Sequence, residues 1–229
     1  MQNTKAYIML VCATLFWAGN FMIGKFAFIS NIPPMSLVFL RWSLVWFILL
    51  PFTYKEILKK KKEIVNNLPL LLFLGLTSVG LFNSFVYVSL QYTQVINASL
   101  FNTAIPAAII LSCFIFKIEK TNFYQLLGLL ISVLGILVII TKFNLNILLN
   151  LDFNIGDIWM IGAVICWGLY SSFLKKLKLK ISLLSFVHIV CACGLIFLLP
   201  QFSYEYFQGN AASIAVSYTH LTLPTKRIV

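Results

Sequence analysis

Seven long apolar runs constrain this chain more than any other feature. A helix needs about twenty residues to cross the roughly 30 Å hydrocarbon core of a bilayer. The runs of about that length are residues 6–29, 35–53, 68–90, 95–116, 123–141, 157–174 and 182–200. Only 10% of the 229 residues are charged, whereas about a quarter are charged in an ordinary soluble domain. The sequence therefore predicts an all-α membrane protein with about seven transmembrane helices.

Basic residues are concentrated in alternate connections between these runs. Twelve of the 17 Lys and Arg residues lie at Lys5 or in the segments 55–62, 117–120 and 175–180. Cytoplasmic loops carry the excess of Lys and Arg, so we expect a multi-pass protein of the cell (inner) membrane with a cytoplasmic N-terminus. We interpret the lysine run as a surface that faces lipid headgroups, with no nucleic-acid partner.

The sequence offers no constellation that would make this chain an enzyme. It contains no H-E-x-x-H motif, no Gly-rich phosphate loop after a strand and no paired carboxylates. All five cysteines fall inside apolar runs, which favours small buried hydrophobic residues over disulfides or metal ligands. We expect no catalytic residues, no metal and no cofactor, and any transport would draw on a gradient instead of ATP hydrolysis.

A weak internal repeat links the first and sixth runs. When residue n is written beside residue n + 150, "ATLFWAGNFMIGK" (13–25) lies over "AVICWGLYSSFLK" (163–175). Ala, Trp and Lys recur in register, although chance similarity between two tryptophan-bearing helices is the alternative. Five spans separate the copies, so they would cross the membrane in opposite directions. Inverted repeats of this kind are typical of secondary transporters, whose substrate site lies near the membrane midplane.

Taken together, these segments resemble the EamA-type permeases of the drug/metabolite transporter superfamily. The resemblance is carried by "FWAGNFMIGK" in the first run, "PPMSLVFLRW" at the start of the second and "GDIWMIGAVICWGLY" in the sixth. It implies an inverted repeat of five-helix bundles, that is, a ten-helix permease fold. On that basis residues 1–145 form the first repeat and residues 146–215 form an incomplete second repeat of about two helices.

The C-terminal segment departs from that family pattern. A ten-helix permease would need three more spans after Pro200, so we expect the chain to be C-terminally truncated. We interpret residues 216–229, "SYTHLTLPTKRIV" with the preceding Val216, as a non-native tail that resembles a translated sequencing adapter. The alternative is a genuine short extracellular tail on a seven-helix protein.

Polar residues inside the apolar runs are the candidates for a substrate-binding site. The substrate-binding candidates are Trp17, Asn20, Arg41, Asn83, Tyr87, Asn102, Trp167 and Tyr170. At 1.5 Å per residue, Asn20 lies about 21 Å from the cytoplasmic side and Arg41 roughly 9 Å below the outer surface, so the two share a depth. Modest interhelical hydrogen bonds are the alternative for such groups, but several together favour a wet cavity.

Arg41 has three alternative roles in this scheme. A guanidinium at that depth costs a few kcal/mol unless it faces water or finds a partner. It could pair with Asp157 or Asp152, cap backbone carbonyls, or bind the carboxylate of a substrate. The residues alone leave these alternatives open.

Three further residues have both a structural and a functional interpretation. Lys25 lies near the outer boundary, where its ammonium could extend to the headgroups or belong to a vestibule that attracts anions. His188 is either a hydrogen-bonded structural histidine or a proton relay. Pro106 in mid-span permits a kink and is our candidate hinge.

The pattern predicts a secondary transporter that moves small metabolites such as amino acids through alternating access. The resemblance to EamA-type permeases implies that the direction of transport is export. Its expected partners are a small-molecule substrate, the lipid bilayer and, as a further option, a second copy of the chain. The alternative is a non-transporting membrane protein, either an assembly subunit or a lipid-acting membrane enzyme. A lipid enzyme should place charged catalytic groups at the membrane interface, which this sequence does not do.

Overall fold

The computed structural model describes residues 2–119, 122–141 and 154–208, and every regular element among them is helical. The first half contains α1 (Gln2–Ile29), α2 (Pro34–Lys59), α3 (Lys61–Asn66), α4 (Leu68–Gly75), the π-helix η1 (Leu76–Phe82) and α5 (Asn83–Tyr92). The second half contains α6 (Val95–Phe101), the 3₁₀ turn η2 (Asn102–Ala104), α7 (Ile105–Ile115), α8 (Phe123–Thr141), α10 (Ile155–Leu174) and α11 (Leu183–Phe207). The all-α prediction is confirmed.

Among the described residues, six stretches are long and apolar enough to cross a membrane. They are Ala6–Ile29, Pro34–Lys59, Leu68–Tyr92, Val95–Ile115, Ile155–Leu174 and Leu183–Phe207. The seventh predicted run forms α8, whose apolar part is shorter in the described residues. The predicted ends of the second and last runs were too early, since α2 continues to Lys59 and α11 to Phe207. Polar residues there extend the helices beyond the hydrocarbon, where water tolerates them.

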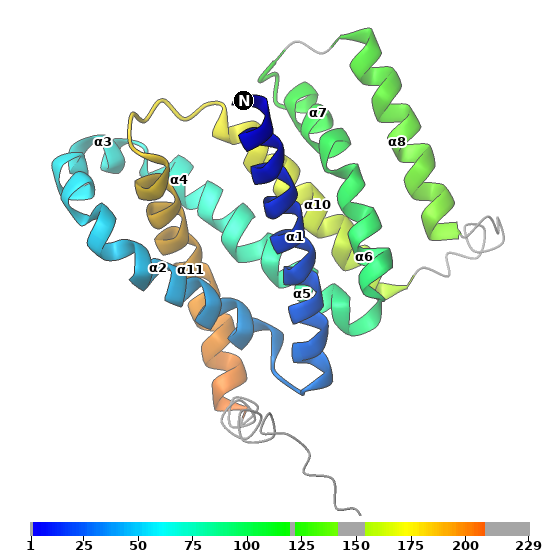
Figure 1. Cartoon of the computed structure of the whole chain (residues 1–229), viewed down its shortest axis with the longest axis horizontal. Coiled ribbons are helices and arrows are strands. Elements are labelled where there is room, and N and C mark those ends of the chain that lie inside the picture. Colours follow the sequence, from blue (N-terminus) through cyan, green and yellow to red (C-terminus); the bar gives the residue numbers. More distant parts are fainter. Residues whose placement is uncertain (1, 120–121, 142–153, 209–229) are drawn as a thin grey trace, which may run out of the picture.

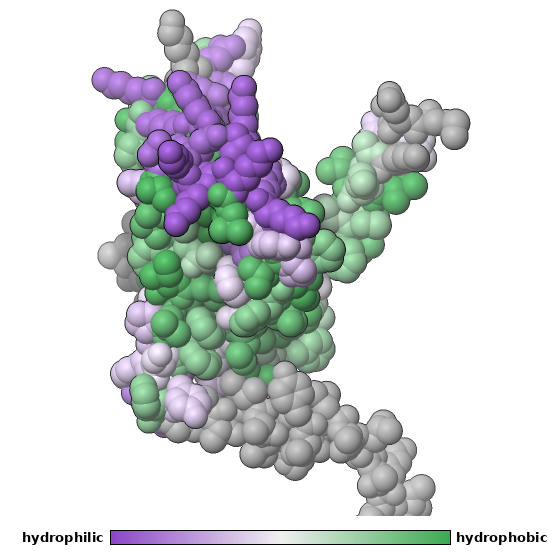
Figure 2. Space-filling view, turned by 90° about the vertical axis from the view of Figure 1, so that its left-hand side faces the viewer, coloured by the Kyte–Doolittle hydropathy of each residue, from purple (hydrophilic) through white to green (hydrophobic). Residues whose placement is uncertain are grey.

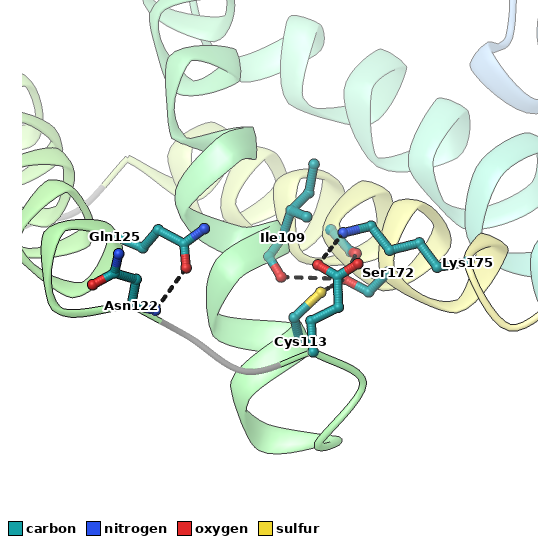
Figure 3. Close-up of polar contacts among 8 residues, drawn as sticks. Ile109, Cys113, Asn122, Gln125, Ser172 and Lys175 are labelled. Atoms are coloured by element: carbon teal, nitrogen blue, oxygen red, sulfur yellow. Dashed lines mark hydrogen bonds and ion pairs between the residues drawn. The ribbon is translucent and has the colours of Figure 1, made fainter.

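The helices form a bundle in which α2 and α11 run side by side in opposite directions (Figure 1). On the other side of the bundle, α10 packs against α5 and α7, and α8 lies beside α7 at the periphery. The Ser172 hydroxyl joins α10 to α7, because it lies 3.2 Å from the carbonyl oxygen of Ile109 and 3.5 Å from the Cys113 sulfur (Figure 3).

The loops predicted to be cytoplasmic meet at one end of the bundle, which we call the lysine-rich end. There Glu56 accepts hydrogen bonds from Ser182, and Lys175 pairs with Glu119 at 2.6 Å. Figure 2 shows the hydrophilic residues gathered at this end of one face, above a broad hydrophobic band. The contacts thus support the grouping of loops, while the side of the membrane stays a prediction.

The opposite end joins the other set of connections. Glu205 at the end of α11 bonds to the first turn of α2, and the Asn154 side chain donates to the carbonyl of Tyr92 at 2.9 Å. The C-terminal part of α1 reaches Thr93 through Lys25, and the first turn of α10 approaches the same residue at Gly156. Helices α1 and α10 therefore run in opposite directions, as the predicted repeat requires.

A widened helical turn lies in the middle of the third span. Between α4 and α5 the backbone is π-helical, and side chains bond back to its carbonyl oxygens. Ser78 Oγ donates to Leu74 O at 2.6 Å, and Asn83 Nδ2 donates to Ser78 O at 2.8 Å. Such side-chain bonds compete with the backbone ladder, which explains the local departure from α-helix. π-Helical segments are frequent at functional sites.

The fourth span is interrupted near Pro106. The 3₁₀ turn η2 separates α6 from α7, and Pro106 is the second residue of α7. A proline is tolerated in a first helical turn because its missing N–H would have had no intrahelical partner there. The residue thus marks a break in the helix, and its use as a hinge stays a prediction.

Close helix crossings depend on glycine. A Cβ at Gly194 of α11 would lie 2.4 Å from Val79 Cβ, and one at Gly75 would lie 2.5 Å from Cys193 Cβ. Two backbones can therefore touch where α11 crosses the third span, which is how helices gain dispersion energy in lipid. At Gly168 of α10 the neighbour at 2.8 Å is Ala108 of α7.

Two sequence-based interpretations need correction or cannot be followed. Cys113, Cys166, Cys191 and Cys193 are buried, but Cys12 is exposed on α1. The prediction of five buried cysteines was wrong for Cys12, because an apolar helix face can meet lipid as well as protein. The proposed non-native tail, 216–229, lies outside the described residues.

We predict that Gly194→Ala lowers the free energy of unfolding by about 1–3 kcal/mol, the range typical of overpacking. The cause is the clash with Val79, which sits on a helix backbone and cannot withdraw freely. Thermal unfolding in detergent micelles provides the measurement. Gly19→Ala is the matched control, because nothing lies within 4 Å of a Cβ at that position. Equal stability of the two variants would contradict this packing.

Candidate functional site

A cavity of about 400 Å³ lies among α1, α2, η1, α10 and α11. Six of the eight predicted substrate-binding residues line it. They are Trp17, Asn20, Arg41, Asn83, Trp167 and Tyr170. The cavity brings together side chains that lie up to 174 residues apart in the sequence, since Trp17 and Cys191 both line it. The sequence put Asn20 and Arg41 at one depth in the membrane, and in the structure their side chains are hydrogen-bonded.

The Arg41 guanidinium is held by three neutral side chains. Its Nη1 donates to Asn20 Oδ1 and to the Tyr87 hydroxyl, and its Nη2 donates to Asn83 Oδ1 at 2.5 Å. Tyr87 donates in turn to Asn20 Oδ1 at 2.7 Å. The guanidinium carbon also lies 5.2 Å from the centre of the Trp42 ring. Arg41 is therefore fixed in orientation at the cavity wall.

The contacts of Arg41 differ from two of the alternatives drawn from the sequence. Its partners are side chains and not backbone carbonyls. The ion pairs found among the described residues are Lys60–Glu63 and Lys175–Glu119, and neither includes Arg41. Asp152 lies outside the described residues. Asparagine and tyrosine satisfy the N–H groups without cancelling the charge, which leaves a cation facing the cavity.

The energies of these contacts explain how Arg41 is accommodated. Insertion scales assign about 2.5–3.5 kcal/mol to an arginine at the centre of a membrane helix. A hydrogen bond to a charged group contributes about 1.5–3 kcal/mol, so three such bonds offset that cost. The network stabilises the guanidinium in place, and its positive charge remains available to a ligand.

Gly24 allows Tyr87 to reach this network. Tyr87 is buried in α5, and a Cβ at Gly24 of α1 would lie 2.6 Å from its ring. Tyr87 itself is not among the residues that line the cavity, although its hydroxyl bonds to both Arg41 and Asn20. Tyr87 therefore holds two residues of the cavity wall in place without lining the cavity itself.

Aromatic rings form the wall contributed by α1, η1 and α10. The Trp167 ring centre lies 6.0 Å from that of Trp17 and 4.6 Å from that of Phe82. Tyr170 is 5.2 Å from Trp167 on the same helix. The tryptophans that the sequence repeat aligned are thus in contact across the cavity wall. A flat apolar group would find complementary surfaces here.

Asn102 is the predicted site residue that lies away from this cavity. It begins the turn η2, and its Oδ1 is buried without a hydrogen-bond partner in the described part of the chain. The run 95–116 carries polar residues on several faces, and the sequence alone could not show which face the cavity would meet.

The α11 wall was missed by the sequence analysis. Val187, Val190 and Cys191 complete the cavity together with Phe186. These residues are apolar and look like ordinary membrane-facing positions. Their spacings of three and four residues, which share a helix face, were the available signal, but such spacings do not separate a cavity wall from a packed core.

Lys25 is not directed to the headgroups. Its Nζ donates to the carbonyl oxygens of Leu90 at 2.8 Å and Thr93 at 3.0 Å. The end of α5 has unpaired carbonyls and the negative end of the helix dipole, which together attract an ammonium group. The boundary position was predicted, but extension to the headgroups was wrong because a nearer acceptor was present.

His188 has a structural environment. It is buried, its Nδ1 bonds to the Thr53 hydroxyl, and the Trp46 ring packs edge-on at 5.2 Å between ring centres. Thr53 donates its single proton to Leu49 O at 2.9 Å, so Nδ1 is the donor toward Thr53. This contact supports the structural interpretation and leaves a proton relay untested.

We looked for side chains that could together bind a metal ion. No group of three or more His, Cys, Asp or Glu side chains that could hold a metal ion occurs in the ranges 2–119, 122–141 and 154–208.

The described helices define a multi-pass helical membrane protein. Residues 4–141 match the EamA-like transporter family, and the chain therefore belongs to that family. No solved structure matches the chain significantly.

Curated relatives carry transporter names. The chain is 29% identical over 174 residues to the uncharacterized transporter YyaM of Bacillus subtilis, covering 74% of this chain and 55% of that protein. It is 28% identical over 201 residues to an uncharacterized transporter of Archaeoglobus fulgidus, covering 87% and 67%. A WAT1-related protein of Arabidopsis thaliana is 25% identical over 216 residues, covering 81% and 58%. The chain thus spans between about half and two thirds of these proteins' lengths.

We predict that Tyr87→Phe lowers the free energy of unfolding by about 1–3 kcal/mol, because Arg41 and Asn20 lose a shared partner in a buried site. Chemical unfolding in detergent micelles measures the change. Tyr92→Phe is the control, since Tyr92 is exposed at the end of the same helix. A loss equal to that of the control would show that the hydroxyl contributes nothing.

Proposed function

We propose that this protein is a secondary transporter for small metabolites that carry a carboxylate, with amino acids as the leading class. The observation that carries the proposal is the charge of Arg41, which faces a cavity and is held by neutral acceptors. An anionic group in the cavity would pair with this guanidinium through charge-assisted hydrogen bonds. Membership of the EamA-like transporter family supports the transport activity.

The rest of the cavity suits the apolar part of such a molecule. Trp17 and Phe82 each offer an aromatic surface close to Trp167, with ring centres 6.0 and 4.6 Å from its own. A volume of about 400 Å³ is within the range of small-molecule sites. The combination favours a molecule with a carboxylate at one end and an apolar side chain at the other.

The transport mechanism that we propose is alternating access between two inverted repeats. The opposite directions of α1 and α10 and the contact between Trp17 and Trp167 support this arrangement. Pro106 would serve as a hinge beside the 3₁₀ turn. We place the protein in the cell (inner) membrane with the lysine-rich end in the cytoplasm, and we propose export as the direction.

A non-transporting role is the second candidate and is less well supported. An assembly subunit would not need a charged residue at a cavity wall, and a lipid-acting enzyme would need reactive groups at the membrane interface. The ion pairs at the lysine-rich end, Lys60–Glu63 and Lys175–Glu119, are partly exposed pairs at the surface. We therefore propose neither catalysis nor a cofactor.

We predict that proteoliposomes containing this chain take up L-phenylalanine in a saturable manner and discriminate against its amide, which lacks the carboxylate. Arg41→Gln should reduce the flux at least about tenfold, because the loss of one charge-assisted pair exceeds 1.4 kcal/mol. Radiolabelled substrate measures flux, and tryptophan fluorescence measures binding, since Trp17 and Trp167 line the cavity.

Lys117→Gln is the charge-matched control, because Lys117 is exposed outside the cavity. This variant should transport as the parent chain does. Flux no greater than that of empty liposomes would contradict transport. Equal flux for the two variants would instead remove Arg41 from the binding site.

A further inference from the structure

Helices α2 and α11 are tied together at both ends by glutamates. At the opposite end, Glu205 of α11 accepts bonds from the first turn of α2. The backbone N–H groups of Met35 and Ser36 lie 3.1 and 2.7 Å from its carboxylate oxygens, and Ser36 Oγ lies 2.8 Å away. The first N–H groups of a helix have no intrahelical partner, so a carboxylate is favoured there.

The lysine-rich end has the same kind of contact, but here α2 supplies the glutamate and α11 supplies the donors. Glu56 of α2 accepts bonds from the first turn of α11. Its partners are the Ser182 N–H at 2.9 Å, the Ser182 hydroxyl and the Ser185 hydroxyl. We call the Glu205–Ser36 and Glu56–Ser185 contacts the two latches.

The latches occupy equivalent positions in the two helices. Glu205 follows Glu56 by 149 residues, and Ser185 follows Ser36 by the same interval. With this offset, six of the 26 residues of α2 are identical in the second copy. They are Ser36, Val38, Leu49, Leu50, Pro51 and Glu56. Both serines are fully buried. The two latches are therefore one contact repeated by the internal symmetry of the chain.

A second layer of contacts lies one turn inside each latch. At the opposite end Phe39 stacks on Phe202, with ring centres 4.5 Å apart. At the lysine-rich end His188 bonds to Thr53. The 149-residue offset carries Phe39 onto His188 and Thr53 onto Phe202. The layers thus match in position although their chemistry differs.

The cavity lies between these layers. From α2 it receives Arg41 and Trp42, and the offset carries these onto Val190 and Cys191, which line it from α11. Along the helix pair the order is latch, inner layer, cavity, inner layer, latch. A solute that leaves the cavity along this pair must pass an inner layer and then a latch.

Hollows at the opposite end reach the Glu205 latch from outside. Two depressions of about 330 and 600 Å³ are both bordered by Glu205 and Pro34. Gln91 borders both as well. The Glu205 latch therefore forms part of the border of both hollows.

We propose that Glu56 and Glu205 are equivalent gate residues, one for each end of the cavity, which release in turn. When α2 and α11 separate at one end, the latch there breaks while the latch at the other end holds the pair together. This inference rests on the alternating access of the proposed function, and it adds the residues that control each opening.

Cys191 supplies a reporter for each opening. It lines the cavity and is fully buried in this structure, so a thiol reagent reaches it only when one end opens. The parent for the test is the full chain with its other four cysteines replaced by alanine. An anionic, membrane-impermeant methanethiosulfonate is applied to sealed vesicles from one side or the other, without substrate.

We expect Glu56→Gln to raise the rate of Cys191 modification about tenfold from the lysine-rich end and to leave the rate from the opposite end unchanged. Glu205→Gln should do the reverse. The magnitude follows from replacing hydrogen bonds to a charged acceptor by weaker neutral ones. Equal acceleration from both ends, or no acceleration in either variant, would overturn the proposal.

Glu119→Gln is the control, since this exposed glutamate pairs with Lys175 and has no role in a latch. It should change neither rate. If a glutamine variant unfolds in a melting experiment, Ser185→Ala and Ser36→Ala replace it, because each removes one bond and keeps the carboxylate. They should give a smaller acceleration from the same end as the corresponding glutamine variant, and the absence of one would overturn the proposal.

The reagent test is independent of the substrate. Absent L-phenylalanine flux together with end-specific labelling would reject the proposed substrate and keep the gates. Intact L-phenylalanine flux, together with Cys191 labelling rates that neither glutamine variant changes, would keep the proposed substrate and reject the gates.

Discussion

The antiparallel contact between α2 and α11 is the constraint on which the rest of the structure depends. These helices lie 149 residues apart in the sequence. A glutamate near the C-terminal end of each helix accepts hydrogen bonds from the N-terminal end of the other. Their middle sections form two walls of the cavity, and Arg41 comes from one of them. Each carboxylate accepts hydrogen bonds from N–H groups at the start of the other helix, which have no partner within that helix. The contact therefore fixes how far the two helices are shifted along each other.

Arg41 shows how the membrane environment shapes the site. A cation at this depth needs hydrogen-bond acceptors, and the surrounding helices supply amide and hydroxyl oxygens from Asn20, Asn83 and Tyr87. Neutral acceptors offset the loss of hydration but leave the charge. The residue 149 positions after Arg41 is Val190 of α11, which also lines the cavity and is uncharged.

Several predictions from sequence agreed with the structure because they depend on local physics. Apolar length predicted the six spans found among the described residues, and loop charge predicted which connections meet. The predictions that were wrong required knowledge of neighbours. Lys25 bonds to the end of α5 instead of the headgroups. The pattern of apolar and polar residues along one helix does not predict where a neighbouring helix will lie.

The sequence by itself determined that this chain is a helical membrane protein, which residues are polar within the apolar spans, and which family it belongs to. Hydrophobic length and the cost of unpaired backbone groups in lipid leave no other fold class. The tertiary structure alone decided which polar residues meet. Asn20, Arg41, Asn83 and Tyr87 come from three spans, and the glutamate latches join residues 126 to 170 positions apart. Such pairings arise from packing between helices, where each partner is chosen by geometry that no single segment specifies.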